Sequence, residues 1–165
     1  MNAYVNTIQH IDSEVGRILQ TLDELNLTSN TFIIYTTDNG PWLGFRHHGG
    51  SAGSLRDGKG TTFEGGQRVP CVMSGPGIPP GTICDELMSS IDLLPTFAAI
   101  TGKPLPQKVK IDGLDATALL MGNGNPPRNE FLYYTSRGEL EGIRQGKWKL
   151  LVKKQKKSIC AIQAF

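Results

Sequence analysis

Two polar residues that could bind a metal ion, Asp38 and Asn39, directly follow a short apolar run at 31–37. This run is β-branched and nearly unbroken, which is typical of a strand covered on both faces, as in a parallel sheet. Ligands of open α/β sheets collect at the carboxyl ends of such strands. A carboxylate and an amide offer hard oxygen ligands, which suit calcium or magnesium better than zinc. The alternative is a plain turn, because residues 38–41 are rich in turn formers.

The second candidate is Lys59, which lies between two glycines in the segment 53–62. Glycines allow a backbone to approach an anion closely. The spacing almost matches the P-loop motif G-x-x-x-x-G-K-[ST], but Gly60 occupies the position of the metal-binding serine or threonine. The segment also follows a loop rather than a strand, so a nucleotide site is not expected. The alternative for Lys59 is a solvated loop lysine.

Helices and strands alternate along the part of the chain that would position these residues. Apolar residues recur every three or four positions over residues 2–25, which predicts an amphipathic helix. The run 31–37 then predicts a strand, and a second short apolar run at 69–73 predicts another. A helix, a tight turn and a buried strand together indicate an α/β fold.

The second half of the chain predicts a further helix from about residue 88 to 100, with Pro95 in its first turns or at a kink. Asp92 resembles a helix-start residue, with Ser89 or Ser90 as a possible cap. A smaller helix is expected at 115–120. Three short strands are expected at 131–135, 141–144 and 147–152, the last two joined as a hairpin through Gln145 and Gly146.

Composition places the chain among globular proteins. Its 165 residues suffice for one domain with a core, and 38% are hydrophobic and 19% charged, with a formal net charge of +2. That balance argues against nucleic acid as the main partner. The one basic cluster, at 153–157, is expected to be a solvated tail. No apolar run approaches the roughly 18–20 residues that span a membrane, so no membrane span is expected.

The three cysteines, Cys71, Cys84 and Cys160, show no zinc-binding spacing, and their odd number does not suggest a closed disulfide framework. Cys71 falls in the apolar run at 69–73 and is expected to be a buried small hydrophobic residue. His10 is expected on the surface or in packing rather than in catalysis. His47 and His48, in the loop after Asn39, are expected to be solvated, the alternative being contact with substrate.

Several motifs occur in a fixed order along the chain. They are TDNGP at 37–41, GSAGSLRDGKGTTFEGGQRVP at 50–70, SSIDLLPT at 89–96, DG at 112–113 and RQGKWKL at 144–150. Together they closely resemble the sulfatase family of the arylsulfatase A type, over about residues 4–152. The resemblance implies an α/β sandwich related to the alkaline-phosphatase-like fold, with a small C-terminal antiparallel sheet.

The resemblance also implies roles for the candidate residues. Asp38 and Asn39 match two ligands of a calcium site, where Mg²⁺ is also possible. Lys59 matches a catalytic lysine that contacts the substrate's sulfate group and stabilises charge as the ester is cleaved. The implied substrate is a sulfate ester of a small molecule or a sulfated glycan.

The nucleophile of this family is a formylglycine made from Cys or Ser in C/S-x-P-x-R, and no cysteine here has that context. Ser74 comes near, but Ile78 replaces the arginine. The formylglycine and the remaining metal ligands are therefore expected in an N-terminal region. The chain is expected to be a C-terminal fragment that is inactive alone.

The expected organisation is a C-terminal part of the catalytic domain at 1–125, the start of a small antiparallel subdomain at 126–152 and a divergent basic tail at 153–165. The resemblance suggests a periplasmic, secreted or lysosomal location, and the oligomeric state stays open. Two alternatives remain: a noncatalytic binding module derived from a sulfatase, and a phosphate- or phosphonate-ester hydrolase on the same superfold. The residues around Lys59 weaken the second.

Overall fold

The structure is a computed structural model that describes residues 3–152, apart from the side chain of His47. The basic cluster at 153–157 and Cys160 lie outside the described residues. The described chain divides into two compact units, the first made of 3–76, 133–142 and 151–152, and the second of 77–132 and 143–150. The expected boundaries at 125 and 152 stay predictions.

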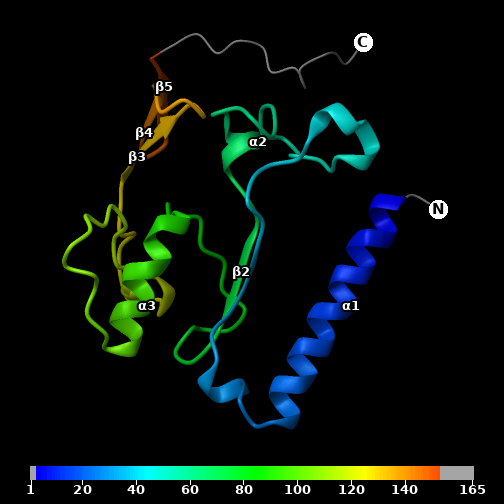
Figure 1. Cartoon of the computed structure of the whole chain (residues 1–165), viewed down its shortest axis with the longest axis vertical. Coiled ribbons are helices and arrows are strands. Elements are labelled where there is room, and N and C mark those ends of the chain that lie inside the picture. The colour runs from blue at the N-terminus through cyan, green and yellow to red at the C-terminus, as the bar shows by residue number, and fades with distance from the viewer. Residues whose placement is uncertain (1–2, 153–165) are drawn as a thin grey trace. The chain divides into compact units, whose positions relative to one another are not determined.

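The first unit begins with the predicted amphipathic helix, α1 (Ala3–Glu24), followed by the short 3₁₀ helix η1 (Thr28–Asn30) (Figure 1). α1 ends where Asn26 adopts a left-handed φ of 56° and the Leu27 N–H donates back to the Leu22 carbonyl at 2.8 Å. No residue of α1 is buried. An open groove of about 410 Å³ separates its 15–22 face from residues 31–35. The apolar stripe that the sequence predicted is therefore present, but it lines an open groove and is not packed into a core.

The expected parallel sheet at 31–37 is wrong. β1 (Ile33–Thr36) pairs antiparallel with β2 (Cys71–Ser74), in a register that places Ile33 opposite Ser74 and Thr36 opposite Cys71. An apolar run shows that a strand favours burial, but it does not say which segment pairs with it or in which direction. A two-stranded ribbon also leaves much of both strands open. Tyr35 and Cys71 are exposed for this reason, so the prediction of a buried Cys71 is wrong too.

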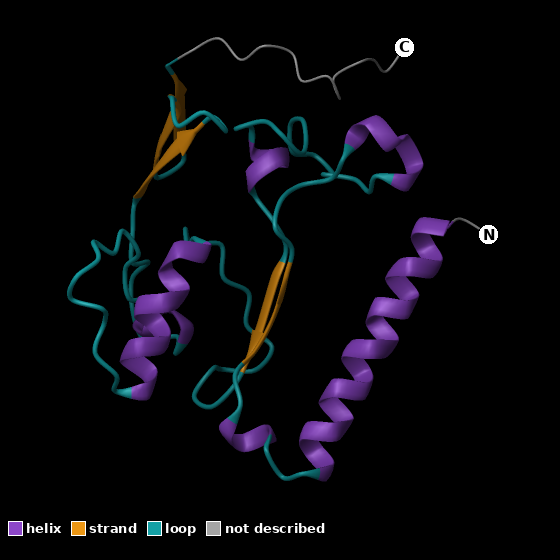
Figure 2. Cartoon of the chain, viewed as in Figure 1, coloured by secondary structure: helices purple, strands orange, loops and turns teal. Residues whose placement is uncertain are grey.

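Between β1 and β2 the chain forms a long loop, interrupted only by η2 (Leu43–His48) and the single-turn helix α2 (Glu64–Gln67) (Figure 2). This stretch holds all the candidate site residues. The chain then returns to pair with β1, so residues far apart in the sequence become bonded. The Thr36 hydroxyl, for example, donates to the carbonyl of Pro70, 34 residues later and just before β2.

The second unit contains η3 (Ser90–Asp92), α3 (Leu93–Thr101) and α4 (Thr117–Leu120), which confirms both predicted helices. Pro95 is the third residue of α3, where its missing N–H leaves no intrahelical bond unmade. Gly102 ends α3 with a left-handed φ of 64°. Ser89 and Asp92 form the capping box that begins the helix, as the sequence suggested.

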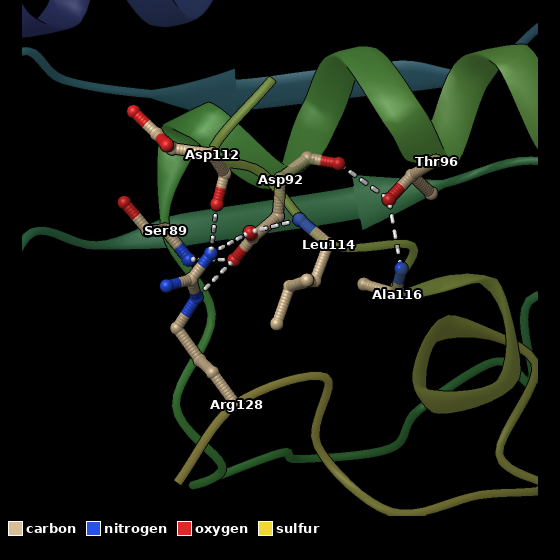
Figure 3. Close-up of polar contacts among 7 residues, drawn as sticks. All are labelled: Ser89, Asp92, Thr96, Asp112, Leu114, Ala116 and Arg128. Carbon is tan, nitrogen blue, oxygen red and sulfur yellow. Dashed lines mark hydrogen bonds and ion pairs between the residues drawn. The ribbon is translucent and has the colours of Figure 1, made fainter. Parts of the chain in front are cut away.

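Asp92 does more than cap a helix, because its carboxylate is fully buried and joins three segments of the second unit (Figure 3). It accepts hydrogen bonds from the Ser89 N–H at 2.9 Å, from the Leu114 N–H at 2.8 Å and from Nε of Arg128 at 2.9 Å. Nη2 of Arg128 completes a two-point ion pair with it. We refer to Ser89, Asp92, Leu114 and Arg128 as the Asp92 clasp.

The hydrogen bonds of the clasp keep Asp92 charged. Burial by itself raises the pKa of its carboxyl, but the Arg128 guanidinium and the Leu114 and Ser89 N–H groups outweigh burial and lower that pKa below its ordinary value of 3.8. Behind the clasp, the buried Thr96 hydroxyl donates to the Asp92 carbonyl and accepts from the Ala116 N–H at 2.9 Å. The interior of this unit is thus organised by polar bonds.

Three strands form the predicted small C-terminal sheet in the order β3-β4-β5: β3 (Glu130–Tyr134), β4 (Leu140–Gln145) and β5 (Trp148–Leu151). The predicted hairpin between the last two is confirmed. Its turn is Gly146 and Lys147, and Gly146 has the positive φ of 54° that such a turn favours. In the described part of the chain, no helix is long and apolar enough to span a membrane.

Candidate functional site

Two backbone hydrogen bonds hold the segment after β1 against the glycine-rich loop. The Gly40 N–H donates to the Gly66 carbonyl at 3.0 Å, and the Lys59 N–H donates to the Pro41 carbonyl at 2.9 Å. The structure therefore places Lys59 beside the turn that begins at Asp38 and Asn39, although 20 residues separate Asn39 from Lys59 in the sequence. The roles of the three residues stay predictions.

The glycines of this region are needed for the approach of one backbone to another. A Cβ atom added to Gly40 would lie 1.7 Å from the Gly65 carbonyl oxygen, and one added to Gly58 would lie 2.4 Å from the Pro41 carbonyl oxygen. The neighbouring atoms are main-chain atoms that cannot rotate away, so any side chain here would force the two segments apart. The sequence indicated a glycine-dependent loop near the site. The structure shows that the glycines bring its two halves together.

A buried hydroxyl group and a side-chain amide fix the loop that carries Lys59. Thr61 is buried and its hydroxyl donates to the Gly58 carbonyl at 2.8 Å, while the Gln67 amide donates to the Thr61 carbonyl at 2.9 Å. Arg56 stacks over the Phe63 ring, 3.8 Å from its centroid. Lys59 is thus an exposed side chain on a backbone that is held on both sides.

The ammonium of Lys59 faces an aromatic ring. Its Nζ lies 5.2 Å from the centroid of the Trp42 ring, within the range of a cation–π interaction. Lys59 takes no part in the ion pairs found among the described residues. The ammonium therefore keeps its positive charge available to an anion that enters from solvent.

Asp38 and Asn39 fit part of a calcium or magnesium site. Asp38 is exposed and Asn39 half-buried, and within residues 3–152 the only side-chain bond to the carboxylate is a long one of 3.3 Å from the Thr37 hydroxyl. The described residues contain no group of three or more His, Cys, Asp or Glu that could hold a metal. Calcium takes about six to eight oxygen ligands, so these two residues could supply only a minority of them.

The sequence missed two residues beside the candidate site, Trp42 and Phe45, and the partner of Asp92 in the second unit, Arg128. The signal for the first two was their position soon after the candidate ligands, with Trp42 next to Pro41 and Phe45 three residues further on. Nothing local in the sequence points to Arg128, which is 36 residues from Asp92. His10 is exposed on α1, in agreement with its expected surface position.

Comparison with known proteins identifies the family. Residues 1–103 match the family profile described as Sulfatase. The chain belongs to the sulfatase family. Among its relatives, human arylsulfatase A is 44% identical over 149 residues, which cover 87% of this chain and 29% of the human protein. The mouse steryl-sulfatase is 39% identical, with 86% of this chain and 24% of the mouse protein covered.

Solved structures place this sulfatase chain in the alkaline-phosphatase-like fold. The PsFucS1 sulfatase of a Pseudoalteromonas species superposes with a TM-score of 0.78 at 33% identity, covering 86% of this chain and 29% of that protein. A sulfatase of Bacteroides thetaiotaomicron gives a TM-score of 0.73 at 30% identity, covering 84% of this chain and 31% of that protein. The chain thus spans about 29% of the length of arylsulfatase A.

Proposed function

We propose that this sulfatase chain is part of a sulfuric-ester hydrolase in which Lys59 binds the sulfate group of the substrate. The observation that carries the proposal is the bond from the Lys59 N–H to the Pro41 carbonyl, which holds the backbone of the exposed Lys59 beside the segment that follows Asp38 and Asn39. A fixed positive charge stabilises the negative charge that grows on the bridging oxygen as the S–O bond breaks. The proposed role of Lys59 is electrostatic rather than that of a base.

We further propose that Asp38 and Asn39 bind calcium, or magnesium, together with ligands from outside these 165 residues. The metal would supply Lewis-acid polarisation of the sulfate oxygens. What the chain itself contributes is two hard oxygen atoms at the end of β1, on a turn that Gly40 fastens to Gly66. The donor chemistry of a carboxylate and an amide supports this assignment over zinc or copper.

The proposed nucleophile is a formylglycine that these residues do not supply, since the sequence contains no C/S-x-P-x-R. The chain alone should therefore not turn over a sulfate ester. Robust hydrolysis of 4-nitrophenyl sulfate by the purified 165-residue chain would contradict this part of the proposal.

A chimaera tests the role of Lys59 directly. The region of human arylsulfatase A that aligns with this chain over 149 residues would be replaced by this chain's residues, so that the human protein supplies the rest of the enzyme. We expect hydrolysis of 4-nitrophenyl sulfate, and Lys59→Ala should lower kcat/KM by about 10²–10³-fold, the usual cost of one charge-stabilising group.

The matched control is Lys103→Ala, another exposed lysine, which follows α3 in the second unit. It should leave kcat/KM unchanged. A Lys59→Ala chimaera that retains activity within about threefold of the parent would sink the proposed role, since one lost charge-stabilising group should cost far more. Faster hydrolysis of 4-nitrophenyl phosphate than of the sulfate would favour the phosphate-ester alternative instead.

A further inference from the structure

Two exposed aromatic side chains stand beside Lys59. Trp42 is 49% exposed and Phe45 is 55% exposed, and their rings meet edge to face, with centroids 4.7 Å apart and planes at 88°. We call Trp42 and Phe45 the aromatic pair. Such a geometry is a favoured one between aromatic rings. With Nζ of Lys59 5.2 Å from the Trp42 centroid, the pair places ring surface and positive charge side by side.

The backbone holds the aromatic pair in place. The Trp42 N–H donates to the Gly49 carbonyl at 3.0 Å, the Phe45 N–H donates to the Trp42 carbonyl at 2.9 Å, and the Gly49 N–H donates to the Arg46 carbonyl at 3.0 Å. A Cβ atom on Gly49 would lie 2.0 Å from the Trp42 carbonyl oxygen, so the loop closes tightly on itself. The pair is therefore carried by a loop of defined shape.

Within this loop the aliphatic side chain packs inward and the two aromatic side chains stay exposed. Leu43 lies against the buried Gly58, where a Cβ atom would be 3.0 Å from the leucine Cγ, so this aliphatic residue packs onto the Lys59 loop. Trp42 and Phe45 remain about half exposed on the same short segment. Arg46, between Phe45 and the closing Gly49, has a φ of 51°, an uncommon value for arginine. The loop thus leaves a large aromatic surface exposed to solvent and holds Arg46 in a strained backbone conformation.

We infer that the aromatic pair binds the organic part of the substrate, through a flat ring face, while Lys59 holds its sulfate group. A sulfate ester of a ring compound carries an anion and an apolar face joined through a single oxygen atom. Adjacent side chains that present a cation and ring surface can contact both parts at once. This inference rests on the proposed function, since it takes Lys59 as the sulfate-binding group, and it makes Trp42 and Phe45 residues that determine specificity.

The chain contains a matched comparison for the Trp42–Lys59 contact. Trp148 is 74% exposed and has Lys147 near its ring, with Nζ 5.6 Å from the centroid. It belongs to a hairpin strand and has no ring partner among the described residues. If an exposed tryptophan next to a lysine were enough to bind a ring sulfate, Trp148 would do so equally well.

Nuclear magnetic resonance on the ¹⁵N-labelled chain, with calcium present, tests the inference without requiring turnover. The probes are inorganic sulfate, methyl sulfate, phenyl sulfate and glucose 6-sulfate. We expect phenyl sulfate to bind about three- to tenfold more tightly than methyl sulfate, as aromatic contacts of this kind allow. It should shift the indole N–H signal of Trp42, which Trp148→Ala identifies by removing the other indole signal. Glucose 6-sulfate shows whether the face of a sugar ring is accepted as well.

The variants then separate the inference from the proposed function. The double change Trp42→Leu and Phe45→Leu should equalise the affinities for phenyl and methyl sulfate, whereas the control Trp148→Ala should keep the difference. If the double variant loses its amide dispersion and so is unfolded, Phe45→Leu alone replaces it as the test. Equal affinities in the unchanged chain, with binding still abolished by Lys59→Ala, would overturn the inference and leave the proposed function intact. Failure of inorganic sulfate to bind through Lys59 would count against the proposed function, and the inference would fall with it.

Discussion

Replacing Asp92 by asparagine should destabilise the second unit against local unfolding. The change removes a buried charge while preserving the shape of the side chain. The carboxylate accepts two backbone N–H groups and two guanidinium N–H groups. The amide NH₂ of asparagine cannot accept, so at least one donor faces another donor. The Arg128 side chain, only 11% exposed, would lose its counter-charge.

The magnitude follows from that loss. Removing one partner of a buried ion pair costs about 3–5 kcal/mol. Asparagine keeps one acceptor oxygen, so the lower end of that range, about 3 kcal/mol, is the expected loss for Asp92→Asn. At about 1.4 kcal/mol per factor of ten, this corresponds to a roughly 150-fold change in the opening equilibrium.

Amide hydrogen exchange measures this opening. The best reporter is the Ala116 N–H, which is bonded to the Thr96 hydroxyl and touches neither the Asp92 side chain nor Arg128 directly. Its exchange should accelerate by roughly 150-fold in Asp92→Asn if the unit opens cooperatively. The Lys59 N–H, bonded to Pro41 in the other unit, should keep its rate.

Asp112→Asn is the matched control. Its side chain is 75% exposed and lies 3.8 Å from Lys110, which is 92% exposed. Arg128 donates to the Asp112 main-chain carbonyl at 3.3 Å, and the substitution retains that bond. Exchange at Ala116 should be unchanged in this variant. The reasoning about the clasp would be refuted if Asp92→Asn altered the Ala116 rate by less than about threefold, far short of the buried-pair loss.

Three further outcomes are expected. The pKa of Asp92 is lowered below 3.8, so the clasp stabilises the second unit fully above that pH and loses this effect as the pH falls through the folded-state pKa. Urea unfolding of the unchanged chain should therefore show a loss of stability in acid, and unfolding of Asp92→Asn should not. Gly40→Ala should separate the two site segments and shift the amide signals of 58–66 towards random-coil values, whereas Gly16→Ala in α1, where no atom lies within 4 Å, should be neutral or slightly stabilising. Calorimetric titration should find only weak calcium binding by the chain alone, weakened further by Asp38→Asn, and tight binding would instead favour an independent binding module.

Local patterns in the sequence were sufficient to predict most of the elements. The apolar period of 3.6 predicted α1, the cap residues and Pro95 marked the beginning of α3, and Gly146 marked the C-terminal hairpin. Each of these depends on residues a few positions apart, so the printed order of amino acids carries the information. The motifs around Asp38 and Lys59 likewise sufficed to indicate the sulfatase family.

Pairings between distant segments could not be predicted in the same way. Asp92 was recognised as a helix-start residue, but its ion pair with Arg128 joins positions 36 residues apart. Trp42 and Phe45 gained their significance only when the Lys59 loop folded back onto Pro41. In both cases a side chain with an ordinary local role acquires another from a neighbour that no local spacing encodes.

The amino-acid order by itself determined which faces are apolar, where helices begin and end, and which residues could bind a metal or an anion. Only the tertiary structure decided that β1 pairs antiparallel with β2, that Cys71 is exposed and that two glycine-containing backbones meet at Gly40 and Gly58. The physical reason is that burial of apolar surface is non-directional, so a pattern states that a face favours cover without naming the partner. Direction and register come from hydrogen bonds between segments, and those exist only in three dimensions.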